Sequence, residues 1–397
     1  MKILTFTTLF PHNINPNFGI FIANRMTAFA KRGHEVKVVA PVPYFPGWSC
    51  LKRFPKWHSL SQVARKEERM GMEVFHPRYF LTPKIGMSFY GLEMFFSVLP
   101  LVRQIRKSFA FDLIDAHYLY PDGLAAILLG KLFDCPVVVS ARGSDVHQYS
   151  EFFWIKKWLK YVLKSSCASI SVSSDIGETM VELGSPAAST HIIPNGIDGK
   201  IFYCMDKQEA RAKCNLPQDQ KIILGVGHLN ERKNFLLLVE AMNFLAKGEH
   251  LYLIGQGDAR EKFISKIAEC KLQDRVHLIS PVKNSELCYW YNAADLLCHP
   301  SKHEGSPNVV CEAIACGCPV VASNLAGCQK AVQSEKQGTI VPTWELKDYI
   351  HALEEALWKK EYDRKWISTE GHKRTWDSVA VEVEDVFQKA LQKYQRK

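Results

Sequence analysis

The sequence contains no pair of aspartates in the pattern Asp-x-Asp, and no set of His, Asp or Glu with the spacing of metal ligands. It therefore does not predict a carboxylate site for a divalent cation. It also has no zinc-finger spacing, RNP motif or long block of Lys and Arg, which argues against nucleic acid as a partner. The balance of 50 basic and 41 acidic residues gives a net charge of +9, which fits an anionic substrate or an anionic membrane surface.

A disulfide framework and a targeting segment are also missing. The 12 cysteines are scattered without pairing, which predicts reduced thiols in the cytoplasm. Cys316 and Cys318 form a Cys-x-Cys, but no second cluster completes four ligands, so we expect packed side chains and no structural zinc. The first residues lack the three regions of a signal peptide and are expected to enter a strand directly.

No apolar run is long enough for a confident membrane span. Residues 85–102 are the most apolar stretch, but Gly86, Gly91, Glu93 and Pro100 interrupt it. We expect a buried or interfacial helix here.

Short apolar runs alternate with helical patterns along the chain, the order expected for parallel α/β sheets. One set of predicted strands lies at 3–7, 36–40, 73–76, 113–116, 137–140 and 169–172. A second set lies at 221–226, 250–254, 276–278, 296–299, 320–322 and 339–341. The length of 397 residues suggests two domains, and turn residues cluster at 194–200 between the sets. We predict two doubly wound, Rossmann-like domains that face each other across a cleft.

The predicted boundaries divide the chain into residues 1–198, 199–375 and a C-terminal helix at 376–397. The tail after residue 361 has large apolar side chains at helical spacing, which we expect to pack on the domains. They are Trp366, Trp376, Val379, Val383 and Phe387.

Residues 301–322 carry the clearest functional pattern. Glu304 and Glu312 lie on either side of a turn that opens a predicted helix at 308–315, whose N-terminal end is positively polarised. Such an end binds phosphate, and each carboxylate can accept hydrogen bonds from the hydroxyls of a different sugar ring. The implied ligand is a nucleotide-sugar. The alternative is a helix with a buried apolar face and a surface glutamate at each end.

A basic loop follows the predicted strand at 221–226. Gly227 permits a tight turn, and Arg232 and Lys233 are placed to meet phosphate oxygens as charge-assisted donors. The alternative is a solvated basic pair. As a dinucleotide fingerprint the loop lacks its third glycine, so a dehydrogenase is a weak interpretation. The later turn at 255–258 predicts a close backbone approach near a base.

Three weaker patterns lie in the first half of the chain. Gly19 precedes a predicted helix, where it either lets the backbone approach a ligand or simply makes a turn. His117 ends an apolar strand and either faces the cleft or belongs to the core and the next helix. Arg142 and Asp145 follow the next strand, and their structural alternative is to pair with each other.

Residues 151–164 are both aromatic and basic. This predicted helix either lies on an anionic membrane or packs on the core with a Lys-rich solvated side. In the first case, other basic residues extend the same face: Arg53, Lys56, Arg65, Lys66 and Arg69.

These motifs together resemble the family-four retaining glycosyltransferases of the GT-B fold (glycosyl transferases group 1), over nearly the whole chain. The resemblance rests on the Gly19 loop, His117, the turns at 142–145 and 195–198, the loop at 227–234, and the Glu304/Glu312 pair. It implies that residues 1–198 hold the acceptor, that residues 199–375 hold the donor, and that the last helix crosses back onto the first domain.

The resemblance also implies a role for each matching residue. Glu304 would bind hydroxyls of the donor sugar, Glu312 would bind the ribose, and Lys233 would stabilise the leaving diphosphate. His117 would contact the donor sugar near the reacting centre, so that the catalytic set is His117, Glu304 and Lys233. The other donor-binding positions are Gly19, Gly227, Arg232, Ser306, Pro307, Asn308 and Val309. No metal and no cofactor is implied.

The implied reaction moves a hexose-type sugar from UDP or GDP to a glycan or lipid-linked acceptor, with retention at the anomeric carbon. In front-face transfer the departing phosphate oxygen takes the acceptor proton, so no carboxylate nucleophile is needed, unlike in retaining hydrolases. Polysaccharide or cell-envelope glycan synthesis is the implied setting. The expected location is the cytoplasm, peripheral on the inner face of the membrane.

Two residues depart from the family pattern. His228 stands where an arginine is common, and Lys330 stands where an acid is common. These changes are the only support for one alternative, a non-catalytic partner subunit that binds the nucleotide-sugar. A second alternative is a nucleotide-sugar epimerase with the same two-domain architecture, which would need acid/base carboxylates around the sugar and no acceptor.

Overall fold

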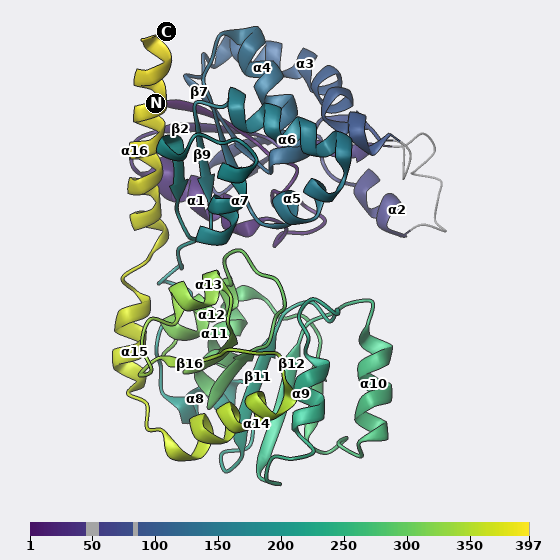
Figure 1. Ribbon diagram of the computed structural model, residues 1–397, viewed down its shortest axis with the longest axis vertical. Helices are drawn as coiled ribbons and strands as arrows, with labels where there is room; N and C mark the ends of the chain where they lie inside the picture. The colour runs from purple at the N-terminus through teal and green to yellow at the C-terminus, as the bar shows by residue number, and fades with distance from the viewer. Residues whose placement is uncertain (45–54, 82–85, 397) are drawn as a thin grey trace. The chain divides into compact units, whose positions relative to one another are not determined.

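The computed structural model describes residues 1–44, 55–81 and 86–396. Its two compact units comprise Met1–Asn195 with Trp376–Lys397, and Gly196–Thr375. Each unit has its own mainly parallel sheet with helices on both faces (Figure 1). The predicted pair of doubly wound α/β domains is therefore confirmed as a fold.

The first unit contains an eight-stranded sheet. In spatial order its strands are β10 (Thr190–Ile192), β9 (Ala168–Ser171), β8 (Val137–Ala141), β7 (Leu113–His117), β1 (Lys2–Phe6), β2 (Glu35–Val39), β5 (Met72–Phe75) and β4 (Lys66–Arg69). All neighbours run parallel except β4 and β5. A separate parallel pair joins β3 (Val42–Tyr44) to β6 (Arg78–Phe80). The six strands predicted in this half are all present.

Helices cover both faces of this sheet. They are α1 (Ile20–Lys31), α2 (Pro55–Ser61), α3 (Tyr90–Ser108), α4 (Leu124–Phe133), α5 (Ser144–His147), α6 (Phe153–Ser165), α7 (Ser174–Glu182) and α16 (Trp376–Gln395). The C-terminal α16 lies beside α1, where Val383 and Phe387 share a buried cluster with Met26 and Phe29 (Figure 1). Among the described residues, none of the helices has both the length and the apolar character needed to cross a bilayer.

The second unit contains a six-stranded, wholly parallel sheet. Its spatial order is β13 (Val276–Ile279), β12 (Glu249–Ile254), β11 (Lys221–Val226), β14 (Leu296–His299), β15 (Val320–Ser323) and β16 (Gly338–Val341). The helices are α8 (Lys207–Lys213), α9 (Leu236–Ala241), α10 (Arg260–Glu269), α11 (Asn284–Ala293), α12 (Asn308–Ala315), α13 (Ala326–Ala331), α14 (Leu346–Glu354) and α15 (Arg364–Gly371). The six predicted strands of this half are also present.

Each sheet has a topological switch point. Strand β1 pairs with β2 on one side and β7 on the other, and β11 pairs with β12 and β14. At such a point the connections leave in opposite directions and open a crevice at the carboxyl ends of the strands. The loop after β1 carries Gly19, and His117 is the last residue of β7. The loops after β11 and β14 carry Lys233 and Glu304.

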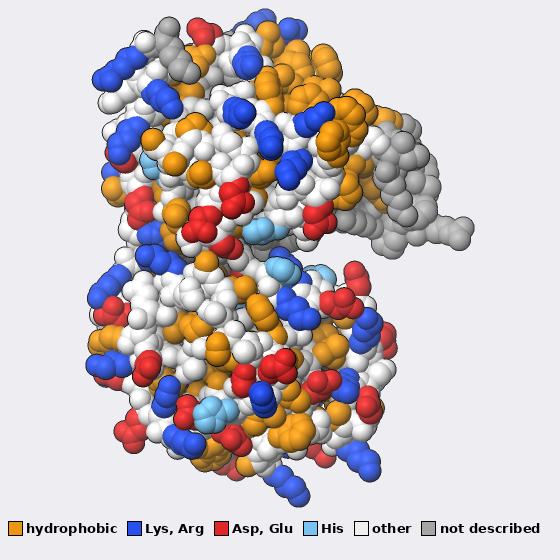
Figure 2. Space-filling model, viewed as in Figure 1, with side chains coloured by type: hydrophobic (Ala, Val, Ile, Leu, Met, Phe, Trp, Pro, Cys, Tyr) orange, Lys and Arg blue, Asp and Glu red, His pale blue; other side chains and the backbone are white. Residues whose placement is uncertain are grey.

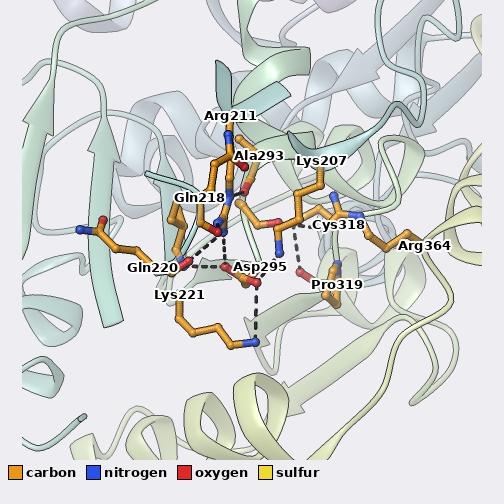
Figure 3. Close-up of polar contacts among 12 residues, drawn as sticks. Lys207, Arg211, Gln218, Gln220, Lys221, Ala293, Asp295, Cys318, Pro319 and Arg364 are labelled. Carbon is orange, nitrogen blue, oxygen red and sulfur yellow. Dashed lines mark hydrogen bonds and ion pairs between the residues drawn. The ribbon is translucent and has the colours of Figure 1, made fainter. Parts of the chain in front are cut away.

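An ion-pair cluster lies at the opposite, amino edge of the second sheet (Figure 3). Asp295 accepts hydrogen bonds from Arg211 at 2.8 Å and from the backbone N–H of Ile222 at 2.7 Å, and it also pairs with Lys207. Arg211 is buried, and it donates to carbonyl oxygens of the 217–220 loop. These contacts tie a loop and α8 to the sheet, so the cluster has a structural explanation.

We predict that Asp295→Ala destabilises the second unit by roughly 3 kcal/mol, because it leaves Arg211 buried without its counter-charge. Urea unfolding followed by tryptophan fluorescence measures the change. Asp274→Ala, which removes an exposed carboxylate from the same unit, is the matched control. Equal unfolding midpoints for the two variants would contradict the structural role.

Candidate functional site

The carboxyl ends of β11 and β12 lie against each other through glycines. Gly227 and Gly255 have φ angles of +152° and +158°, and a Cβ on Gly255 would clash with the carbonyl oxygen of Gly227. A Cβ on Gly257 would clash with the carbonyl oxygen of Leu229. The predicted close approach at this turn is thus made to the chain's own 227–229 loop. Its approach to a base stays a prediction.

Lys233 and Glu304 form a buried ion pair at the carboxyl ends of β11 and β14. Both side chains are 11% exposed, and the ammonium of Lys233 donates to Oε1 of Glu304. Oγ of Ser301 donates to the same oxygen at 3.1 Å, and Nε2 of His299 lies 3.5 Å away. Burial would raise the pKa of Glu304, but His299 and Lys233 outweigh it and hold that pKa well below its usual range. The carboxylate is therefore ionised at physiological pH.

The rest of the basic loop is more open. Arg232 and His228 are exposed beside the buried Lys233. The carbonyl oxygen of Arg232 accepts a hydrogen bond from the N–H of Lys302 at 2.9 Å, which joins this loop to the loop that carries Glu304. The alternative of a solvated basic pair is therefore wrong for Lys233, although the exposed Arg232 fits it.

Helix α12 begins at Asn308, as the sequence predicted. Ser306, Pro307 and Val309 lie with Asn308 at the N-terminal end of this helix, where the first N–H groups have no partner within the helix itself. The start of α13 packs closely on the loop that precedes α12, because a Cβ on Gly327 would clash with the carbonyl oxygen of Gly305 in that loop. The loop is thus fixed from both sides, and its positive helix end suits an anion.

Glu312 lies one turn further along α12 and is not exposed. Its Oε2 accepts a hydrogen bond from the hydroxyl of Tyr291 on α11 at 2.9 Å. Burial raises the pKa of Glu312 to about 7, which the hydrogen bond from Tyr291 offsets in part. The alternative of a surface glutamate at each end of the helix is wrong, since neither carboxylate is exposed.

In the first unit, Gly19 precedes the first residue of α1. It has a left-handed φ of +64°, and a Cβ there would clash with the carbonyl oxygen of Leu9. Glycine is therefore required for reasons within the chain, which supports the alternative of a turn. Contact between its N–H and a phosphate stays a prediction.

His117 is completely buried at the end of β7, and both of its ring nitrogens are engaged. Nε2 lies 2.9 Å from Oδ2 of Asp115, and Nδ1 lies 2.7 Å from the guanidinium of Arg142. Burial lowers the pKa of His117 to about 3, so the imidazole is neutral. Contact of His117 with a donor sugar stays a prediction, and it requires the ring to release one of these partners.

Arg142 and Asp145 do not pair through their side chains as the structural alternative suggested. The guanidinium of Arg142 donates to Asn195 at 2.9 Å as well as to His117. Oδ1 of Asp145 instead accepts the backbone N–H groups of Arg142 and Gly143, at 2.9 and 2.8 Å. A short carboxylate that caps a tight turn in this way satisfies backbone donors that burial would otherwise leave unpaired.

The structure thus groups the predicted residues unevenly. It brings Lys233 into contact with Glu304, and it places Glu312 on the helix that follows the Glu304 loop. Gly19, His117, Arg142 and Asp145 belong to the first unit, and the other predicted positions belong to the second.

Several polar partners at these sites were not predicted from the sequence. Tyr291 gave no signal, because a tyrosine in an amphipathic helix is ordinary. His299 carried the same signal as His117, a histidine at the end of an apolar strand. Arg25 and Asp115 were detectable as charges inside segments otherwise patterned for burial.

The comparisons with known families match both units. Residues 19–200 match the family described as Glycosyltransferase Family 4. Residues 206–372 match Glycosyl transferases group 1.

A similar relative is TuaC of Bacillus subtilis strain 168, provisionally named a teichuronic acid biosynthesis glycosyltransferase. It is 27% identical over 372 residues, which cover 92% of this chain and 90% of TuaC.

Two solved structures show the same fold over whole chains. Sucrose-phosphate synthase from Thermosynechococcus elongatus has a TM-score of 0.79 at 21% identity, covering 100% of this chain and 99% of that one. Anabaena HepE in complex with UDP has a TM-score of 0.73 at 18% identity, covering 98% and 100%. The chain belongs to the family-four glycosyltransferases and has their two-domain, Rossmann-like GT-B fold.

Proposed function

We propose that the protein is a retaining glycosyltransferase that moves a sugar from a UDP- or GDP-sugar to a glycan or lipid-linked acceptor in polysaccharide or cell-envelope glycan synthesis. The observation that carries the proposal is the buried Lys233–Glu304 pair at the switch point of the second sheet, followed by Glu312 on α12. The name of TuaC supports the polysaccharide setting, and the UDP bound to HepE supports a uridine donor.

The proposed roles follow from charge and position. Lys233 gives one N–H to Glu304 and retains two for the oxygens of a diphosphate. The ionised Glu304 accepts hydrogen bonds from hydroxyls of the donor sugar, and Glu312 accepts hydrogen bonds from those of the ribose. The positive end of α12 and the exposed Arg232 add positive electrostatic potential where the phosphates would bind.

Transfer then needs no protein nucleophile. The bond from the anomeric carbon to the diphosphate oxygen breaks, and a bond from that carbon to the acceptor oxygen forms on the same face. The departing phosphate oxygen takes the acceptor proton. Lys233 and the helix end stabilise the negative charge that develops on the diphosphate.

We also propose that this chemistry runs without an obligatory metal. The chain has no Asp-x-Asp, and within residues 1–44, 55–81 and 86–396 no group of three or more His, Cys, Asp or Glu side chains could hold a metal ion. The cationic groups of the 227–234 loop and the α12 terminus take the place of a cation in this scheme.

We propose an anionic membrane surface as the place of the acceptor. The aromatic side chains at the start of α6 are exposed, by 66% for Phe153 and 60% for Trp154. Lys157 lies over both rings, and the exposed Lys156 and Lys160 follow on the same helix. Figure 2 shows hydrophobic side chains beside Lys and Arg over α3 and α6. This combination suits the headgroup region of a bilayer.

Two of the basic residues predicted to extend this face form ion pairs with nearby glutamates. Lys66 pairs with Glu73, and Arg69 pairs with Glu67. Arg53 and the side chain of Lys56 lie outside the described part of the chain. The membrane proposal therefore rests on α6 and its neighbours.

We predict that the protein binds one family of nucleotide-sugars in the presence of EDTA. Glu312→Ala should weaken this binding about 10-fold or more, which is the loss expected for a hydrogen bond to a charged group. Isothermal titration calorimetry with UDP-, GDP- and ADP-sugars measures both. Glu261→Ala on α10 removes an exposed carboxylate and is the control. Binding that appears only when a divalent cation is added would contradict metal independence.

Turnover separates the proposed transfer from its alternatives. Conversion of the donor in the absence of any acceptor would favour an epimerase. Tight donor binding without transfer to any acceptor would favour a non-catalytic partner subunit.

Donor affinity should rise with pH, because only ionised Glu312 accepts both ribose hydroxyls. With the pKa of Glu312 at about 7 in the free protein, we expect affinity at pH 8 to exceed that at pH 6 by about 10-fold. Glu312→Gln should remove this dependence. A rise in affinity at low pH would contradict the assignment to Glu312.

The α6 surface predicts salt-sensitive binding to vesicles that contain phosphatidylglycerol, measured by co-sedimentation. Phe153→Ser with Trp154→Ser should abolish binding, and Lys156→Glu with Lys157→Glu should weaken it most at low salt. Phe244→Ser removes a ring that is 63% exposed in the second unit and is the control. Equal sedimentation with neutral and anionic vesicles would overturn the proposal.

A further inference from the structure

A buried ion pair lies beneath the carboxyl ends of β7 and β8. Arg25, on the core-facing side of α1, is 2% exposed, and its guanidinium lies 2.7 and 2.8 Å from the two carboxylate oxygens of Asp115. It also donates to Oγ of Ser140 at 3.1 Å. A hydrophobic residue could fill this space without the desolvation penalty of two buried charges, so the pair calls for an explanation beyond stability.

The hydrogen bonds around His117 allow one tautomer. A guanidinium can only donate, so Nδ1 of His117 must accept from Arg142. The ring proton is therefore on Nε2, where it donates to Asp115 at 2.9 Å. The contact of 3.3 Å between Arg25 and Nε2 then joins two donors and is not a hydrogen bond.

Burial is the main cause of the neutral state of His117, and the charge of Arg25 offsets the opposing effect of Asp115. Asp115 beside a histidine would otherwise favour the doubly protonated imidazolium, whose Nδ1–H would repel the guanidinium of Arg142. The positive charge of Arg25 compensates Asp115 from the side of α1, and Arg142 adds positive charge from the turn after β8. The same helix supplies Phe21, whose ring lies 5.1 Å from the Arg142 guanidinium.

We infer that Arg25 is a positioning residue: through Asp115 it fixes the Nε2–H tautomer of His117, which in turn holds the Arg142 guanidinium at the carboxyl ends of β7 and β8. The network links α1, which follows Gly19, to the end of β7 that carries His117, so the parts of the first unit expected at the reacting centre are held together by direct contacts. This inference rests on the proposed transferase function for its effect on rate, but the tautomer does not depend on that function.

The tautomer can be measured directly by nitrogen-15 NMR of the histidine-labelled full-length protein, with His117→Gln to assign the signal. We expect a neutral ring with its proton on Nε2 from pH 5 to pH 8. A proton on Nδ1, or an imidazolium in this range, would overturn the inference even if the protein proved to have no transferase activity.

The effect on catalysis is measured with Arg25→Met. We expect kcat to fall about 10- to 100-fold, the loss that follows a displacement of about 1 Å in a reacting geometry. The affinity for the free nucleotide should change little, because its proposed contacts with Lys233 and Glu312 lie in the second unit. A new ionisation should appear in the pH profile of kcat as His117 gains a second proton.

Further variants separate positioning from stability. Arg25→Met with Asp115→Asn should recover most of the lost rate, because the amide oxygen of asparagine still accepts the Nε2–H. Arg25→Lys keeps the charge and should lose less rate than Arg25→Met. Arg32→Met, at the exposed end of α1, is the matched control.

Thermal unfolding of each variant gives the folded fraction. If Arg25→Met loses activity only in proportion to its unfolded fraction, or keeps the wild-type pH profile when folded, the pair is merely structural and the inference fails. If Arg25→Met does not fold, the double variant and Arg25→Lys still test the rate. Failure of the wild type to bind any nucleotide would instead remove the proposed function.

Discussion

Parallel pairing of the strands is the constraint on which both units depend. Parallel neighbours cannot be joined by a short hairpin. Each connection between them crosses a face of the sheet, usually as a helix, and returns to the end of the sheet at which the previous strand began. The polar loops consequently gather at the carboxyl ends, and the strand order reverses beside β1 and β11. Residues 71 positions apart, Lys233 and Glu304, come into contact for this reason.

Burial of charge is the second organising effect, and for two carboxylates of one segment it has opposite outcomes because their partners differ. Glu304 meets Lys233, so its pKa falls despite burial. Burial raises the pKa of Glu312 to about 7, because the hydrogen bond from the neutral hydroxyl of Tyr291 offsets it only in part. One carboxylate is therefore ionised at physiological pH, while the other titrates near neutral pH. Two glutamates that are equivalent in the sequence thus become different chemical groups.

Glycines show where local pattern and tertiary structure diverge. The sequence predicts close backbone approach at Gly255 and Gly257, and the approach occurs, but to the 227–229 loop of the chain itself. Likewise a glycine is required at position 19, because a Cβ there would clash with the carbonyl oxygen of Leu9 and because Gly19 has a left-handed backbone conformation. A glycine in a turn indicates that another group lies close to the backbone. The glycine does not identify that group, because the absence of a side chain carries no chemical specificity.

The sequence by itself determined the α/β class, twelve of the strands, the start of α12 and the segment that carries Glu304 and Glu312, because hydrophobic period and helix-start signals are local. The short strands β3, β4, β6 and β10 and the partners of the charged residues were decided only by the tertiary structure. Arg142 meets His117 and not the side chain of Asp145, and Arg25 reaches Asp115 across 90 positions. Such partners depend on which helix covers which face of a sheet, a long-range property that local spacing does not encode.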